Sequence, residues 1–151
     1  AEPVRKQLVA GSIPVLRAGT PGRLLAPGLA PDLSARLDDD LLLSGRAQRL
    51  GDREIVLYKP RWGAFFGTTL DDYLNENHVD TVVVAGCNYP NCPRTSIYEA
   101  SERDYRLVLV NDAVSGLYDR GRAETANIGV TLCAADAVIA AVREATGGTA
   151  A

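Results

Sequence analysis

The sequence has little of what metal sites and disulfide frameworks need. It contains one histidine, His78, and three cysteines, Cys87, Cys92 and Cys133. One histidine and two loosely spaced cysteines do not match the ligand spacing of a zinc site, so we expect no metal and no other cofactor. An odd, sparse set of cysteines is typical of reduced thiols in the cytoplasm rather than of paired disulfides.

Long apolar runs and clusters of basic residues are also missing. No stretch approaches the roughly 18 apolar residues of a membrane span. The net charge is −3, and lysine and arginine are scattered along the chain, which argues against a nucleic-acid or membrane-surface partner. The first residues, AEPVRKQLVAGS, are mixed and charged and do not resemble a signal peptide. These absences favour a cytoplasmic protein.

What the chain does contain is an alternation of apolar strands and helices. Its 151 residues are 46% apolar, enough for one domain, which we place at 1–146 with a flexible tail at 147–151. Helices are predicted at 3–11, 68–77, 95–104, 118–127 and 135–145, and strands at 12–19, 54–60, 80–87, 105–112 and 127–133. The strands are continuous apolar runs, which predicts a mostly parallel sheet inside a three-layer α/β/α sandwich of the Rossmann-like class.

The segment GCNYPNCPRTS at 86–96 lies where a buried strand turns into a helix. Pro93 suits the first helical position, which makes Cys92 the predicted N-cap. A thiol there faces the positive end of the helix dipole and unpaired N–H groups, and both favour a nucleophilic thiolate over a merely buried cysteine. Cys87 and Cys133 are expected to serve packing instead.

Three polar residues fall at the predicted carboxyl ends of strands, where ligands bind in parallel sheets. These are Lys59, Cys92 and Asp112. Near Cys92, Lys59 would hold the thiolate and polarise a carbonyl substrate; from spacing alone, a lysine that extends into solvent is an equal alternative. Asp112 is expected to brace the loop after its strand, and His78 to be a solvated residue at a helix end.

The turn around Pro90 could aim the N–H groups of Asn88 and Cys92 at one point and form an oxyanion hole. Trp62, in a glycine-punctuated aromatic loop, is a candidate wall for a flat or apolar substrate. Predicted substrate contacts are Trp62, Phe65, Asn88 and Tyr89. We also expect at least one phenylalanine of the loop, Phe65 or Phe66, to belong to the core.

Residues 54–112 resemble the isochorismatase-like cysteine hydrolases, the superfamily of nicotinamidases, carbamoylsarcosine amidohydrolase and isochorismatase. The resemblance rests on KPRWGAFFGTTLDDYL at 59–74 and DTVVVAGCNYPNCPRTSIYEASERDYRLVLVNDAV at 80–114, and continues more weakly to about residue 142. It implies an Asp–Lys–Cys triad in which Lys59 is the lysine and Cys92 the nucleophile. It also implies a cis peptide between Cys87 and Asn88, and an oxyanion hole formed by the N–H groups of Asn88 and Cys92.

The same resemblance implies the reaction. Isochorismatases that cleave vinyl ethers tend to lack the cysteine, so Cys92 favours cleavage of a C–N bond of a small amide or carbamoyl compound through a thioester. The alternatives are a non-catalytic homologue that binds a small molecule or partner, and a vinyl ether hydrolase. Nicotinamidases carry an Asp/His metal cluster for which no histidine is present here, so nicotinamide is not favoured. Relatives commonly form homodimers or higher homo-oligomers.

One feature departs from the family pattern. The family's acid ends a first strand in a hydrophobic–Asp–x–Gln run, and these residues contain no such segment; Asp32 and the aspartates at 38–40 do not match it. We expect a native N-terminal segment to supply this strand. A strand from another chain, or a degenerate homologue without the acid, are the alternatives.

Overall fold

The structure is a computed structural model that describes residues 3–11, 17–31 and 35–147. The chain divides into two units, Ala1–Val56 and Leu57–Ala151. The expectation of a single domain over 1–146 stays a prediction. In the described part of the chain, no helix is both long and apolar enough to cross a membrane.

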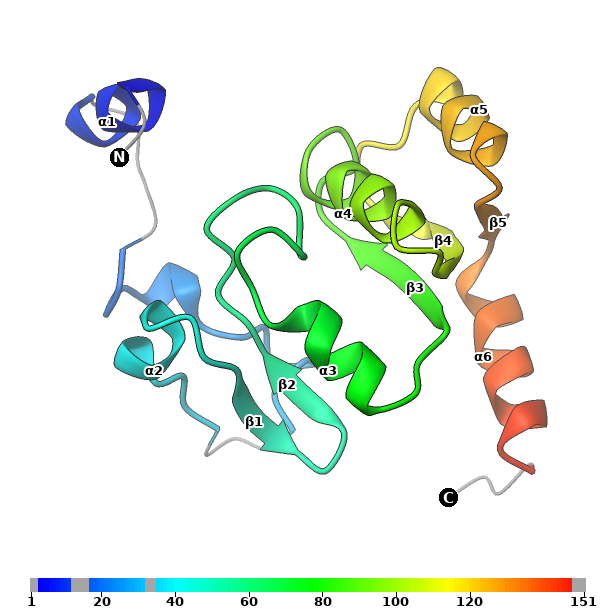
Figure 1. Ribbon diagram of the computed structural model, residues 1–151, viewed down its shortest axis with the longest axis horizontal. Helices are drawn as coiled ribbons and strands as arrows, with labels where there is room; N and C mark the ends of the chain where they lie inside the picture. Colours follow the sequence, from blue (N-terminus) through cyan, green and yellow to red (C-terminus); the bar gives the residue numbers. More distant parts are fainter. Residues whose placement is uncertain (1–2, 12–16, 32–34, 148–151) are drawn as a thin grey trace. The chain divides into compact units, whose positions relative to one another are not determined.

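The first unit contains short elements, of which Figure 1 labels the α-helices and the strands. They are α1 (Pro3–Ala10), the 3-10 turn η1 (Pro21–Arg23), α2 (Asp39–Leu43), β1 (Gln48–Gly51) and β2 (Glu54–Val56). The predicted first helix is confirmed, whereas the predicted strand at 12–19 falls largely on residues outside the described ones. Sequence analysis missed α2 and β1, which pairs with β2 as an antiparallel hairpin. The predicted strand at 54–60 therefore ends early, at Val56.

The second unit contains the elements that the sequence predicted best. They are α3 (Leu70–Glu76), β3 (Thr81–Gly86), α4 (Cys92–Ser101), β4 (Arg106–Val114), α5 (Asp119–Asn127), β5 (Thr131–Cys133) and α6 (Ala135–Ala145). Strands β3, β4 and β5 form a parallel sheet in that order. The predicted α/β class with a parallel sheet is confirmed.

The core of this unit is built on β4, the middle strand. Leu107 and Leu109 are buried in one cluster with Ile97 of α4. Side chains alternate between the faces of a strand, and Val110, which follows Leu109, is also buried. Helix α4 packs against β3 and β4, α6 against β4, and α5 against β5 (Figure 1). These contacts between helices and strands hold the turns at the ends of the strands in place.

Strand β3 forms one edge of this sheet. Within the described residues it pairs with β4 alone, although its sequence, TVVVAG, is that of a buried strand. Val83 in its middle is 46% exposed. The strand ends at Gly86, whose φ of 116° is a conformation that suits glycine and lets the chain turn toward α4.

Candidate functional site

Cys92 is the first residue of α4, directly after the turn that follows β3. The prediction that it is the N-cap is wrong by one residue: Asn91 is the N-cap, and Pro93 is the second helical residue. Pro93 and Ile97 are buried on the inner face of α4, which packs against β3 and β4. Cys92 itself is a partly exposed free thiol, so a reagent or substrate can reach it.

The backbone donors around Cys92 are in part satisfied within the protein. In the first turn of α4, Arg94 N–H donates to Tyr89 O (3.2 Å), Thr95 N–H donates to Asn91 O (3.0 Å), and Pro93 has no N–H. Within the described part of the chain, the N–H groups of Cys87, Asn88 and Cys92 have no acceptor. The predicted cis peptide between Cys87 and Asn88 is confirmed. The N–H groups of Asn88 and Cys92 are therefore free to bind a ligand, and the oxyanion hole that they would form stays a prediction.

The turn between β3 and α4 is fastened to the end of β4. Tyr89 N–H donates to Ser115 O (2.7 Å), and Ser115 N–H donates to Gly86 O (3.1 Å). Within the turn, Asn91 N–H donates to Asn88 O (3.1 Å). These bonds fix the backbone of the turn, which carries the N–H groups of Asn88 and Cys92.

The side chain of Tyr89 lies in the core and not in the site. It is fully buried, and its hydroxyl donates to Gly121 O (2.9 Å) and hydrogen-bonds Thr125 Oγ1. Its ring meets Tyr118 edge-on, with centroids 5.7 Å apart. Burial raises the pKa of Tyr89, which keeps the hydroxyl protonated as a donor. The predicted substrate contact through this side chain is corrected to a core contact.

Lys59 lies in the loop after β2 rather than at a strand end. Its Nζ donates to Arg61 O (3.1 Å) and Trp62 O (2.9 Å). In the described residues it makes no ion pair with a carboxylate and no hydrogen bond to the Cys92 thiol. Lys59 thus organises its own loop, and direct contact with Cys92 stays a prediction.

The loop that holds Lys59 is nevertheless attached to α4 near Cys92. Ala64 N–H donates to Ser96 Oγ (3.1 Å), and Ser96 Oγ donates to Cys92 O (2.8 Å). One turn further along the helix, Glu99 Oε2 accepts the N–H of Phe65 (2.9 Å). Sequence analysis missed Ser96 and Glu99; the signal was a line of polar residues on the same helix face as Cys92.

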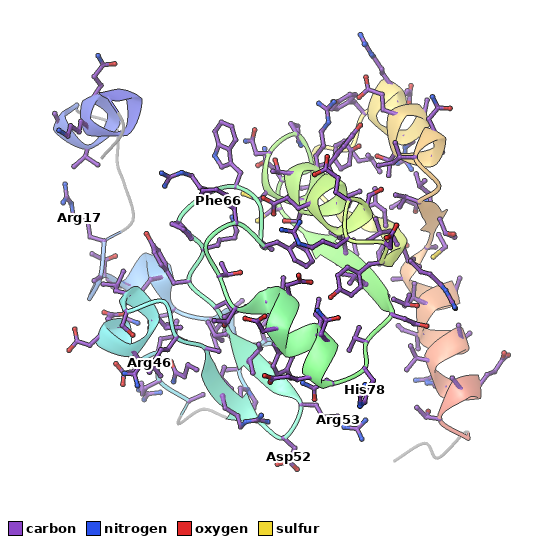
Figure 2. All side chains as sticks on the ribbon, in the orientation of Figure 1. Arg17, Arg46, Asp52, Arg53, Phe66 and His78 are labelled. Atoms are coloured by element: carbon purple, nitrogen blue, oxygen red, sulfur yellow. The ribbon has the colours of Figure 1, made fainter. Side chains whose placement is uncertain are left out.

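The aromatic residues of this loop divide between core and surface. Phe65 is 5% exposed, packs against the Tyr105 ring (5.8 Å) and lies under the Arg103 guanidinium (5.0 Å). The expected core phenylalanine is therefore Phe65, and its predicted substrate contact is corrected. Phe66, labelled in Figure 2, and Trp62 are 57% and 60% exposed. Trp62 remains available to a ligand.

The remaining candidates have structural places. Asp112 lies within β4, and its Oδ1 accepts the N–H of Ala135 (2.8 Å) at the start of α6, so it holds the start of that helix rather than the loop after its own strand. His78 is exposed beyond the end of α3 (Figure 2), as predicted. The prediction that Cys87 is a packing residue is wrong, because Cys87 is exposed, and Cys133 is only partly buried. Among residues 3–11, 17–31 and 35–147, no cluster of His, Cys, Asp or Glu is arranged to hold a metal ion.

The attachment of the Lys59 loop leaves no room at Gly63. A methyl group on this buried glycine would overlap the Glu99 carboxylate that accepts the Phe65 N–H. Gly63→Ala is expected to lower the free energy of unfolding by about 1–3 kcal/mol, the cost of overpacking and of a displaced charged acceptor. Urea denaturation measures this change.

Gly51→Ala is the matched control, since the nearest atom to its added methyl group lies 3.6 Å away, an ordinary contact. Its stability should stay within about 1 kcal/mol of the starting protein. Equal stability of the two variants would contradict the close fit between Gly63 and Glu99.

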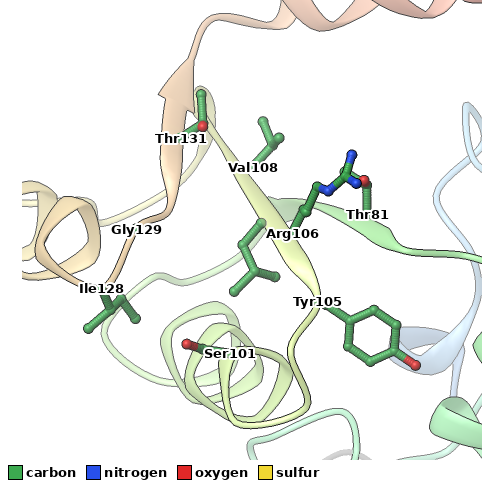
Figure 3. Close-up of a pocket in the computed structure, with 9 residues that line it drawn as sticks. Thr81, Ser101, Tyr105, Arg106, Val108, Ile128, Gly129 and Thr131 are labelled. Carbon is green, nitrogen blue, oxygen red and sulfur yellow. The ribbon is translucent and has the colours of Figure 1, made fainter.

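A pocket of about 520 Å³ lies beside the first residues of the three parallel strands (Figure 3). Its lining comes from the first residues of the strands, including Thr81, Arg106 and Thr131, and from the ends of α4 and α5 at Ser101 and Ile128. Cys92, by contrast, follows the last residue of a strand. None of the predicted site residues lines this pocket.

Comparison with known proteins gives one family. The model of the isochorismatase domain matches residues 42–141. A solved isochorismatase family protein from Desulfovibrio vulgaris is 31% identical, with a TM-score of 0.67; the alignment covers 94% of this chain and 67% of that one.

Curated relatives match over shorter stretches. A maleamate amidohydrolase from Pseudomonas putida is 41% identical over 61 residues, which is 40% of this chain and 29% of the relative. A probable inactive nicotinamidase from Arabidopsis thaliana is 32% identical over 92 residues, 60% of this chain and 44% of the relative. The chain thus spans less than half the length of these two relatives.

Proposed function

The chain belongs to the isochorismatase family, and from this premise we propose that it carries the nucleophile site of a cysteine hydrolase that cleaves C–N bonds of small amides. The observation that carries the proposal is the position of Cys92: a partly exposed thiol at the start of α4, whose own N–H group and that of Asn88 in the preceding turn have no acceptor in the described residues. This is the arrangement that an acyl-transfer reaction needs.

In the proposed reaction, the Cys92 sulfur attacks the carbonyl carbon of the amide. The thiol proton passes to a general base, which in this family is an aspartate. The N–H groups of Asn88 and Cys92 hold the developing oxyanion, and Lys59 stabilises the thiolate. Collapse of the tetrahedral intermediate breaks the C–N bond, releases ammonia or an amine with a proton, and leaves a thioester. Water then hydrolyses the thioester to a carboxylic acid and the free thiol.

The proposed substrates are small amides or carbamoyl compounds. Support comes from the amidohydrolase name of the Pseudomonas putida relative and from the exposed indole of Trp62, which can cover a flat substrate. Asn88 is proposed to contact the substrate through its backbone N–H. Assembly into homodimers or higher oligomers stays a prediction.

The proposal is tested by the rate at which the three thiols react with iodoacetamide. Mass spectrometry of the peptides should show Cys92 labelled at least about 10-fold faster than Cys87, because the N-terminus of a helix stabilises negative charge on an attacking sulfur. Cys87 is a demanding control, since it is exposed in the same turn. Equal, slow labelling of Cys92, Cys87 and Cys133 would count against a nucleophile at this position.

A non-catalytic binding protein is the second candidate. It is favoured by the relative described as a probable inactive nicotinamidase. Release of ammonia or amine from a panel of small amides decides between the two. A protein whose Cys92 is labelled fast but which turns over none of the panel fits the binding role.

A further inference from the structure

We propose that Tyr89 is a positioning residue for the oxyanion hole: through its contacts with α5, this buried side chain sets the two N–H groups of the turn that it belongs to. The inference rests on the proposed function of Cys92. Tyr89 lies between Asn88 and Cys92, and the sequence predicted it as a substrate contact. Its burial assigns it a different role.

Every polar group of Tyr89 is held by the protein. Its N–H donates to Ser115 O (2.7 Å), its carbonyl accepts the Arg94 N–H (3.2 Å), and its hydroxyl bonds Gly121 O and Thr125 Oγ1. The backbone of the turn is thereby tied to the end of β4, and the side chain is tied to α5. Rotation of the turn would break both sets of bonds together.

The receiving surface on α5 fits the phenol ring closely. A Cβ at Gly121 would lie 2.6 Å from Tyr89 Cε1, so glycine is needed for the ring to reach its place. Thr125, the partner of the hydroxyl, is itself fully buried. A buried hydroxyl that loses its hydrogen-bond partner costs free energy, so the contact between Tyr89 and α5 favours a single geometry.

The contacts between Tyr89 and α5 should affect the N–H groups of Asn88 and Cys92 more than the Cys92 thiol. An oxyanion hole works only when its donors lie about 2.7–3.1 Å from the oxygen that gains charge, and a shift of about 1 Å can cost about 100-fold in rate. The Cys92 side chain, in contrast, is carried by α4, whose residue Ile97 packs in the same core cluster as Tyr89, and a substitution that keeps the Tyr89 ring leaves that packing in place. Loosening Tyr89 should therefore impair oxyanion formation and spare the nucleophile.

Two reactions of the same thiol separate these effects. Acetylation by p-nitrophenyl acetate forms a C–S bond, passes through an oxyanion and expels p-nitrophenolate. Alkylation by iodoacetamide forms an S–C bond and expels iodide without an oxyanion. Tyr89→Phe, which keeps the ring and removes the hydroxyl, is expected to slow acetylation of Cys92 about 10-fold or more, a fraction of the loss of a whole donor. Alkylation of Cys92 and its pH profile should stay unchanged.

Tyr105→Phe is the matched control, because it removes a tyrosine hydroxyl bonded to Asp71 (2.8 Å) in the same unit, away from the turn. It should change neither rate. Thr125→Val removes the hydroxyl that bonds the Tyr89 hydroxyl. It should also slow acetylation of Cys92 and leave alkylation unchanged. This variant replaces Tyr89→Phe if that protein folds poorly.

Unchanged acetylation in both variants, or equal slowing of acetylation and alkylation, overturns the positioning role. Failure of the proposed function looks different: in the unsubstituted protein, Cys92 would then react with either reagent no faster than Cys87.

Discussion

Under the proposed mechanism, replacing Cys92 with alanine is expected to abolish hydrolysis of small amides, lowering kcat by at least about 10³-fold, because the thioester forms on the Cys92 sulfur. Loss of a nucleophile that works together with a base and an oxyanion hole costs about 10⁶-fold in well-studied acyl-transfer enzymes. The oxyanion donors that remain would support only weak residual catalysis. The measurement is release of ammonia or amine from the amide panel, with the acyl-enzyme followed by mass spectrometry.

Cys133→Ala is the control for this variant, since Cys133 lies in β5 and is only partly buried. It removes the same atoms from the same unit and should keep kcat within about 2-fold, as expected of a substitution away from the reacting atoms. Turnover that persists in Cys92→Ala, or falls equally in Cys133→Ala, would refute covalent catalysis by Cys92.

Replacing Leu109 with alanine is expected to lower the free energy of unfolding by about 2–5 kcal/mol. Leu109 is fully buried in the middle of β4, between β3 and β5, and joins Ile97 of α4 in the core cluster. The loss combines the transfer free energy of the removed methyl groups with the cavity they leave. Domains are stable by only about 5–15 kcal/mol, so this one change can remove a large share of stability. Urea denaturation followed by circular dichroism measures it.

Leu43→Ala makes the same chemical change at a side chain that is 55% exposed. Its cost should stay within about 1 kcal/mol, because little apolar surface returns to water. Similar costs for Leu109→Ala and Leu43→Ala would mean that β4 is not the centre of the core.

The elements of the second unit were predictable because each carries a strong local pattern. The apolar run at 81–85 and the amphipathic run at 135–145 leave no competing interpretation. Two elements of the first unit were not predicted because their local patterns are weak. Helix α2 has five residues, and β1 has the sequence QRLG, so both are too short or too polar to show a clear periodicity. The predicted strand at 54–60 runs past β2 because Leu57 and Tyr58 continue its apolar run, but these two residues lie in the loop after β2.

The position of Cys92 was predictable because strand, turn and helix signals bracket it. The role of Tyr89 was not, nor which of Phe65 and Phe66 is the core residue, since an aromatic residue in a polar turn or loop suggests a ligand wall. What decides is space made elsewhere in the sequence: Gly121, in the next helix, admits the Tyr89 ring. Lys59 shows the same limit, because its partners are backbone carbonyls, which carry no sequence signal.

The edge position of β3 has a consequence for handling the protein. An edge strand offers a row of unpaired N–H and C=O groups to any other strand, and TVVVA has the high β-propensity and lack of charge that favour intermolecular pairing. The residues that deter such pairing, lysine and proline, are absent from these five. Unless another strand covers β3, the protein should be prone to aggregate in concentrated solution. A charged residue introduced on this edge should reduce that aggregation.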